Sequence, residues 1–211
     1  MTNQYKDKPY NDYGQWIRQR FPFRVQKISV DAGFSCPNRD GTISHGGCIF
    51  CDNRTFNPSH CQPSKSLAQP MEEGKALFRR KYPDMKYLAY FQAYSNTYAP
   101  LDVLKRRYEE ALAVENVVGL VIGTRPDCIS TELLDYLEEL NRRTFLIVEY
   151  GIESVNDDTL RHINRGHNFE CSRRAIELTH DRGILTGGHI ILGLPGEDRE
   201  ENIRQASIVS D

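Results

Sequence analysis

The sequence lacks a long apolar segment of the kind that spans a membrane or directs secretion. The stretch from Met1 to Asp12 is polar and carries both signs of charge, unlike a signal peptide. A formal net charge of only -2 gives no overall attraction to nucleic acid, so any contact with RNA would need a local basic patch. These absences favour a cytoplasmic protein with no membrane partner.

Cysteine is scarce outside one stretch of the chain. Of six cysteines, three lie between Cys36 and Cys51. Small secreted scaffolds held by disulfides are shorter and denser in cysteine than this chain. The distribution therefore favours reduced cysteines that act as ligands.

The length and composition suit one globular domain. Hydrophobic residues make up 39% of the 211 residues and charged residues 27%, which excludes a disordered chain. Short runs rich in Val, Ile, Leu and Tyr alternate with longer amphipathic stretches, the pattern of repeated strand-helix units and a parallel sheet. The predicted strands are Val25 to Val30, Tyr87 to Ala93, Val117 to Gly123, Phe145 to Tyr150 and Leu185 to Leu192.

Helical spacing of apolar residues fills the intervals between these strands. Five strand-helix units in sequence predict an α/β fold with a barrel-like sheet, whose functional residues follow the C-terminal ends of the strands. The fifth strand would be an exposed parallel edge, so we expect the barrel to be truncated after its fifth unit. Helices are predicted at Ser66 to Lys81, around Leu101 to Leu112, around Leu133 to Leu140, at Asn168 to Arg182 and from Asp198 onward.

The loop after the first strand reads DAGFSCPNRDGTISHGGCIFCDN and spaces Cys36, Cys48 and Cys51 as C-x11-C-x2-C. Thiolates bind soft metals, and three of them on a four-iron cluster leave one iron open for chemistry. The alternative is structural zinc, with Cys61, His45 or His60 as the fourth ligand, because C-x2-C alone is common in zinc sites. The loop by itself leaves both open.

Further motifs occur after or within the predicted strands. They are KISVDAGFSCPNRDGT, GGCIFC, YFQAYSNTYAP, GLVIGTRPDCI, VEYGIES, INRGH and GHIILGLPGE. Together they resemble the radical S-adenosylmethionine (SAM) superfamily, and within it the YtqA/YhcC-type proteins, which are similar to the catalytic subunit of Elongator. The first gap between cysteines is longer than in the commonest superfamily pattern, C-x3-C-x2-C, and such gaps are known in the Elongator-like branch.

This resemblance implies a partial (β/α)6 TIM-like barrel of the radical SAM type. Residues 1–22 would be an N-terminal extension and residues 23–211 the radical SAM core. The implied cofactors are a [4Fe-4S] cluster on Cys36, Cys48 and Cys51, and SAM on the open iron. The implied activity is reductive cleavage of SAM to a 5'-deoxyadenosyl radical, with an electron from a reductant such as flavodoxin or ferredoxin.

The resemblance also suggests residues that bind SAM. Phe50 matches an aromatic position near the adenine, although ordinary loop packing is an equal alternative. Ser95, Asn96 and Thr97 follow the second strand, where relatives hold the methionine amino group, but this chain lacks the acidic form of that motif.

Later motifs contain basic residues that could also bind a ligand. Arg125 is a candidate to meet a carboxylate or phosphate, the alternative being a turn contact with Asp127. Arg165 and His167 are candidates for binding phosphate or substrate, or belong to a solvated loop.

Glu149 ends an otherwise apolar strand face, where a carboxylate is costly unless it is partnered or functional. Glu153 and Ser154 match a region that contacts SAM in relatives, or else cap the next helix. Gly193 and Leu194 lie in the LGLPGE turn, where relatives let backbone approach the adenine, the alternative being a tight turn.

The Elongator-like resemblance makes tRNA the expected substrate, with chemistry on the C5 side chain of wobble uridine that converts carboxymethylaminomethyl to aminomethyl. A second hypothesis is an enzyme of the coproporphyrinogen oxidase type, which acts on a small carboxylated substrate. A third is a non-catalytic zinc-binding interaction module, with Cys61 as a spare ligand. Cys128 and Cys171 are expected to pack in the interior.

Overall fold

The computed structural model describes residues 10, 12–52 and 66–210. Its centre is a sheet of five strands in the order β1-β2-β3-β4-β5, and each neighbouring pair is parallel. Sequential parallel order requires every connection to cross the same way, which produces a curved, barrel-like sheet. The strands are β1 Val25–Val30, β2 Lys86–Phe91, β3 Val117–Thr124, β4 Phe145–Glu153 and β5 Leu185–Ile190.

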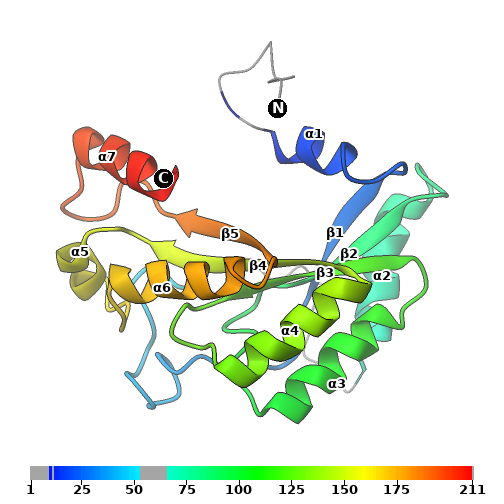
Figure 1. Cartoon of the computed structure of the whole chain (residues 1–211), viewed down its shortest axis with the longest axis horizontal. Helices are drawn as coiled ribbons and strands as arrows, with labels where there is room; N and C mark the ends of the chain where they lie inside the picture. Colours follow the sequence, from blue (N-terminus) through cyan, green and yellow to red (C-terminus); the bar gives the residue numbers. More distant parts are fainter. Residues whose placement is uncertain (1–9, 11, 53–65, 211) are drawn as a thin grey trace.

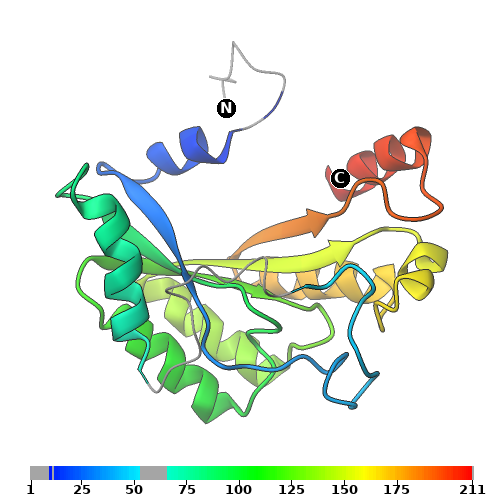
Figure 2. The same cartoon turned by 180° about the vertical axis from the view of Figure 1, so that it is seen from behind.

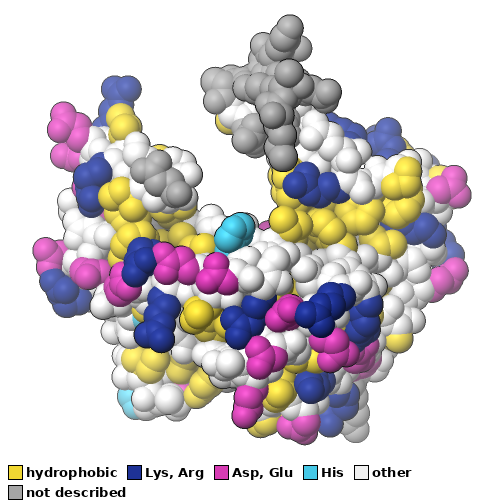
Figure 3. Space-filling model, viewed as in Figure 1, with side chains coloured by type: hydrophobic (Ala, Val, Ile, Leu, Met, Phe, Trp, Pro, Cys, Tyr) yellow, Lys and Arg dark blue, Asp and Glu magenta, His cyan; other side chains and the backbone are white. Residues whose placement is uncertain are grey.

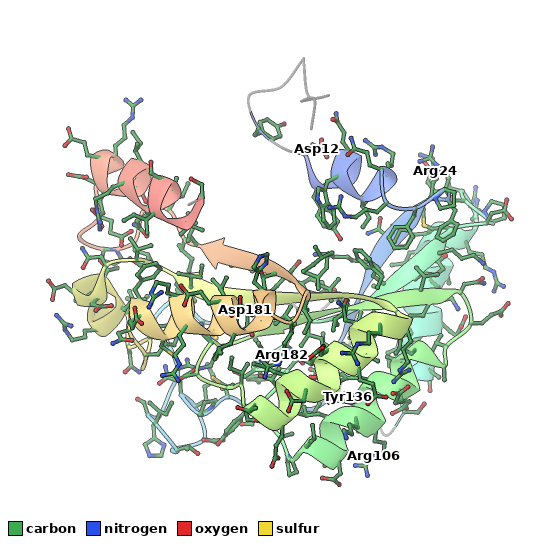
Figure 4. The ribbon with its side chains drawn as sticks, in the orientation of Figure 1. Asp12, Arg24, Arg106, Tyr136, Asp181 and Arg182 are labelled. Atoms are coloured by element: carbon green, nitrogen blue, oxygen red, sulfur yellow. The ribbon has the colours of Figure 1, made fainter. Side chains whose placement is uncertain are left out.

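Four helices cover the outer face of this sheet (Figure 1). They are α2 Ala68–Arg79, α3 Leu101–Leu112, α4 Thr131–Arg143 and α6 Phe169–His180. The rear view shows the opposite face, over which the loop after β1 runs (Figure 2). Tyr136 lies between α3 and α4, where its hydroxyl donates to Glu109 over 3.1 Å, and Arg182 reaches Asp135 of α4 at 3.0 Å (Figure 4).

Alternation along the strands divides the core in two. Leu120 and Ile122 of β3 face the main core beneath the outer helices, whereas Val121 between them faces a smaller inner core. The inner core is covered by α1, Tyr13–Arg18, through Ile17. Asp12 caps α1 by accepting hydrogen bonds from the backbone of its first turn, and lies at its start in Figure 4. The inner face is therefore apolar at the end of the sheet that α1 covers.

Two further helices lie beside β4 and β5 (Figure 1). They are α5, Asp157–His162, and α7, Arg199–Ser210. The buried Gln205 of α7 accepts a hydrogen bond from the backbone of Val155 at 3.1 Å and donates to Glu197 at 2.7 Å. These bonds attach α7 to the turn after β4. Among the described residues, no helix is long and apolar enough to cross a membrane.

The structure confirms the predicted α/β fold and partial barrel. It shortens two predicted strands: β2 ends at Phe91 and β5 at Ile190, because loops with positive φ at Tyr94 and Gly193 follow them. The sequence analysis missed α1, a six-residue helix, and mentioned α5, also of six residues, only as the helix that Glu153 and Ser154 would cap. The division at residue 23 stays a prediction, although α1 packs on the sheet.

Candidate active site

The C-terminal ends of the strands surround a cavity of about 410 Å³. The three loop cysteines Cys36, Cys48 and Cys51 all line it. All five described cysteines are thiols with no disulfide among them. As expected, parallel strands bring residues that are distant in sequence to one edge of the sheet. Other residues that line this cavity are Arg39, Phe50, Tyr90, Gln92, Ser95, Arg125, Glu149, Glu153, Arg165, His189, Ile190 and Ile191.

The cysteine loop is held in place by the turn between α5 and α6. The backbone N–H of Ile49 donates to the carbonyl of Ile163 over 3.1 Å. Asn164 donates to the carbonyl of Gly47 over 2.9 Å, and Asn38 donates to the carbonyl of Asn164 over 2.5 Å. The INRGH segment therefore fixes the shape of the loop that presents the thiols.

Two side chains donate toward the sulfur of Cys48. Asn38 Nδ2 lies 3.5 Å and Arg165 Nη1 lies 3.7 Å from Sγ. Cys51 follows in a tight turn, with its N–H 3.0 Å from the carbonyl of Cys48, and burial raises the pKa of its thiol. N–H donors to sulfur and nearby positive charge stabilise thiolates, so this environment suits metal-bound sulfur.

Arg165 connects the cysteine loop to the end of β4. Its Nη2 donates to the carbonyl of Gly151 over 2.5 Å and lies 3.5 Å from Glu153. Burial raises the pKa of Glu153, although the charge of Arg165 opposes this shift. Sequence reasoning left Arg165 undecided between a ligand role and a solvated loop, and the structure buries it in the cavity wall at 6% exposure.

Alanine at Gly151 is expected to disturb this connection. A Cβ there would lie 2.6 Å from Nη2 of Arg165 and closer still to the carboxylate of Glu153, so both side chains would have to move. Arg165 would then withdraw from the sulfur of Cys48. We expect iron affinity to fall by roughly 10–100-fold, the usual effect of losing a group that supports a metal ligand. Iron titration would measure it, with circular dichroism to verify folding; unchanged iron affinity would contradict the prediction.

Arg125 follows β3 and is almost fully buried. Its Nε and Nη2 donate to the two carboxylate oxygens of Asp127 at 2.9 and 2.7 Å, so the turn contact considered from the sequence does form. These bonds raise the pKa of Arg125 even though burial opposes them. Its third nitrogen, Nη1, is buried with no partner in the described part of the chain. An unsatisfied guanidinium nitrogen in the wall of a cavity fits a ligand with an anionic or acceptor group.

Glu149 is not alone on its strand face. Its Oε1 lies 2.5 Å from Lys27 Nζ of β1, and its Oε2 lies 3.1 Å from His189 Nε2 of β5. Burial opposes ionisation, but the bonds from His189 and Lys27 outweigh it and lower the pKa of Glu149 to about 2. The costly carboxylate noted in the sequence is therefore partnered. The sequence feature that could have indicated a partner on β1 is the polar face of that strand, which carries Lys27 and Ser29.

Comparison with known proteins decides the family. Residues 39–205 match the radical SAM superfamily. This range contains most of the chain and every residue that lines the cavity except Cys36. The chain belongs to the radical SAM superfamily. It is 42% identical over 205 residues to the uncharacterized protein YtqA of Bacillus subtilis, covering 97% of this chain and 64% of that protein. It is 41% identical to YhcC of Escherichia coli, covering 92% of this chain and 62% of that protein.

A more distant relative matches part of the chain. A tRNA uridine(34) acetyltransferase of Methanocaldococcus infernus is 29% identical over 109 residues, 47% of this chain and 20% of that protein. The chain spans less than two thirds of the length of the curated relatives it matches.

Two solved structures share the radical SAM fold. The Elp3 protein of Methanocaldococcus infernus superposes with a TM-score of 0.60 at 17% identity, covering 88% of this chain and 42% of that one. Coproporphyrinogen III oxidase (HemN) of Escherichia coli superposes with a TM-score of 0.54 at 18% identity, covering 95% of this chain and 45% of that one. At such low identity the likeness concerns the fold alone.

The structure brings only some of the predicted SAM residues to the cavity that the three thiols line. Phe50, Ser95, Arg125, Glu149 and Glu153 line it. These five come from the cysteine loop and from the ends of β2, β3 and β4.

The other two predicted residues after β2, Asn96 and Thr97, form hydrogen bonds between loops instead. Asn96 is fully buried and its Nδ2 donates to the carbonyl of Gly123 over 2.8 Å. Thr97 bonds Thr124 over 2.6 Å and faces a separate hollow of about 580 Å³ between the starts of α3 and α4. Both side chains tie the loop after β2 to the end of β3.

Ser154, Gly193 and Leu194 also lie outside the cavity lining. Ser154 donates to Glu197 over 2.5 Å and accepts from the backbone of Asn156, whose own side chain caps α5. Leu194 is buried in a small apolar cluster beside α5. Gly193 has a φ of 80°, the left-handed conformation of a tight turn, and the residues that line the cavity from this end are Ile190 and Ile191.

The remaining cysteines differ in their surroundings. Cys128 is buried as predicted, and burial together with the charge of Asp127 raises the pKa of its thiol to about 12. Cys171 is only half-buried on α6, because it lies near the exposed start of that helix; the predicted interior packing is wrong for it. Cys61 lies outside the described residues.

The zinc alternative rests on residues of the same loop. In the described ranges, no three Cys, His, Asp or Glu side chains are grouped closely enough to hold one metal ion, and this holds for Cys36, Cys48 and Cys51 as well as for a zinc set that includes His45. His45 pairs with Asp40 in an isolated bridge and is not part of the cavity lining, and His60 lies outside the described residues. Membership of the radical SAM superfamily favours an enzyme over an interaction module.

Proposed function

We propose that this protein is a radical SAM enzyme that holds a [4Fe-4S] cluster on Cys36, Cys48 and Cys51. One observation carries the proposal: the three thiols line one cavity together with Arg125, whose buried Nη1 has no hydrogen-bond partner among the described residues. Three protein thiolates leave one iron of such a cluster open, and an open position is typical of reactive metal sites. When bound, the cluster supplies the electron that cleaves SAM reductively to a 5'-deoxyadenosyl radical and methionine.

The chain's own residues hold and shield this centre. Asn38 and Arg165 donate toward the sulfur of Cys48, which stabilises it as a thiolate ligand. Arg39, which hydrogen-bonds the thiol of Cys51, adds positive charge on the open side. Together these cations offset the negative charge that three thiolates bring into a partly buried site.

We assign SAM contacts to the predicted residues that line the cavity. Arg125 offers its free Nη1 to an acceptor such as the SAM carboxylate, and Ser95 offers a buried hydroxyl at the end of β2. Phe50, between the second and third cysteines, offers an aromatic face for the adenine. Glu153 is the carboxyl group nearest Arg165 and a candidate for the ribose hydroxyls or the methionine amino group.

The proposed substrate is tRNA, with chemistry on the C5 side chain of wobble uridine. Support comes from relatives named tRNA uridine(34) acetyltransferase and Elongator complex protein 3, which match 47% and 42% of this chain. The step would convert a carboxymethylaminomethyl to an aminomethyl group, with the carboxymethyl carbon oxidised by two electrons and released, after addition of water, as glyoxylate. SAM, reduced to methionine and 5'-deoxyadenosine, would be the oxidant, and a flavodoxin or ferredoxin in the cytoplasm would supply the electron that starts the reaction. Likeness to HemN concerns the fold and adds nothing for a porphyrin substrate.

An anaerobic assay tests both parts of this proposal. The protein is reconstituted with iron and sulfide, reduced, and incubated with SAM and tRNA from cells that lack it. We expect 5'-deoxyadenosine to form, and we expect carboxymethylaminomethyluridine to decrease as an aminomethyl product accumulates. Liquid chromatography with mass spectrometry of nucleoside digests measures both.

The two readouts separate the reaction from the substrate. Loss of SAM cleavage in a cluster-loaded preparation would refute the radical SAM assignment. Formation of 5'-deoxyadenosine with an unchanged nucleoside profile would instead leave the enzyme assignment intact and remove tRNA as the substrate. Transfer RNA from the parent strain, which already carries the product, is the matched control.

A further inference from the structure

A chain of charged side chains crosses the inner face of the half-barrel. Lys27 of β1 contacts Glu149 of β4, and Glu149 contacts His189 of β5. β1 and β4 are separated by two strands in the sheet, so Lys27 reaches Glu149 only because the sheet curves around its inner face. Figure 3 shows a hollow between the parts of the molecule that carry α1 and α7, with a histidine side chain at its floor.

The two strands that flank β4 leave space around the side chain of Glu149. In register, its neighbours on β3 and β5 are Gly123 and Gly187, so no side chain flanks it on either side. A Cβ at Gly187 would lie only 3.1 Å from Cγ of Glu149. Two side-chain-free neighbours let the carboxylate lie along the sheet between its two cationic partners.

Of these three residues, His189 is the one that a ligand can reach. Its side chain is 56% exposed, against 21% for Lys27 and 9% for Glu149. Both oxygens of Glu149 are already occupied, and Lys27 Nζ lies 4.5 Å from the ring centres of Tyr13 and Tyr90. In the part of the chain that the structure describes, Nδ1 of His189 has no hydrogen-bond partner.

The electrostatics favour the protonated, cationic form of His189. Its hydrogen bond to Glu149 raises its pKa, which outweighs the effect of burial. The other charged groups that face it are Glu153 of β4 and Lys27 of β1. Nearby Tyr13 and Tyr90 stay neutral, because burial raises the pKa of each phenol. With His189 protonated, the Lys27, Glu149 and His189 group carries one net positive charge.

We propose that His189, held by Glu149, binds the carboxylate of the substrate beside the cysteine site. The inference rests on the proposed function and assigns the residue that recognises the carboxymethyl group. A single net positive charge and one ring N–H suit a monoanionic carboxylate. A dianionic phosphate would meet stronger repulsion from the adjacent Glu149. His189 lines the same cavity as the three thiols, so the bound group lies near the reacting centre.

Binding of two nucleosides tests the inference without turnover. Equilibrium dialysis of the cluster-loaded, SAM-bound protein compares 5-carboxymethylaminomethyluridine with its uncharged methyl ester. We expect the carboxylate to bind about tenfold more tightly, as one charged hydrogen bond would give. This preference should decline as the pH rises through the elevated pKa of His189.

Substitutions assign the preference to the residue. His189→Gln keeps a hydrogen-bond donor without the charge, and should remove both the preference and its pH dependence. Glu149→Gln, which takes away the carboxylate that holds His189 charged, should weaken the preference. His180→Gln is the matched control, because His180 is exposed at the end of α6.

Equal binding of the two nucleosides by the unsubstituted protein would overturn the inference, as would no measurable binding or a preference that survives His189→Gln. Formation of 5'-deoxyadenosine, measured in the same preparations, reports separately on the proposed function. Failure of SAM cleavage with an intact carboxylate preference would refute the enzyme assignment and support the binding site.

Discussion

Serine at Cys36, Cys48 or Cys51 is expected to abolish both cluster binding and SAM cleavage. Each thiol lines the cavity, and none is paired in a disulfide. Loss of a group that only supports a metal ligand costs about 10–100-fold in affinity or activity, and we expect loss of a ligand itself to exceed 100-fold. Iron and sulfide content after anaerobic reconstitution, and the rate of 5'-deoxyadenosine formation, measure the effect.

Cys171→Ser is the matched control for these variants. Cys171 is half-buried on the outer helix α6 and does not line the thiol cavity, so its loss should leave the iron content unchanged. Cluster binding that survived all three single substitutions would contradict the ligand assignment. Loss of iron in the Cys171 variant as well would indicate unfolding rather than loss of a ligand.

The fold could be predicted from the sequence because its signals are local. Apolar runs of strand length alternate with amphipathic stretches, and parallel order follows from that alternation. Short helices gave weaker signals. In α1, Asp12 is a good N-cap and Trp16 and Ile17 form an apolar face, but a six-residue helix is stable only through its packing.

The cysteine site could also be predicted from a local signal, because its three cysteines lie close together in one loop. The lining from later strands could be predicted only in part. Within a strand, alternation tells which side chain faces inward, and this identified Glu149. In the turns that follow, no periodicity exists, so neighbouring residues such as Ser95 and Thr97 proved to face different hollows.

The contact of Lys27 with Glu149 was beyond sequence reasoning. The two residues are 122 positions apart and lie on strands that are not neighbours. Their meeting depends on the curvature of the whole sheet, which no local pattern specifies. His189 was missed for the same reason, although the glycines before it indicate a place where something approaches β5 closely.

Glutamine at Glu149 is expected to change how stability depends on acid. The folded state lowers the pKa of Glu149 from an ordinary value of 4.5 to about 2. A carboxylate with a lowered pKa stabilises the fold above its unfolded pKa, and this contribution is lost as the pH falls through the folded pKa. At neutral pH the contribution is about 3 kcal/mol, and it should disappear between about pH 4.5 and pH 2.

Urea unfolding of the protein and of Glu149→Gln at a series of pH values measures this contribution. The two unfolding free energies should differ most near neutral pH and converge toward pH 2, because protonated Glu149 and glutamine are both neutral. Glu170→Gln, which removes an exposed carboxylate that pairs with Arg173 on α6, should leave the pH dependence nearly unchanged. A constant difference at all pH values would show that Glu149 acts through packing, because only the ionised carboxylate can hold Lys27 and His189 by charge.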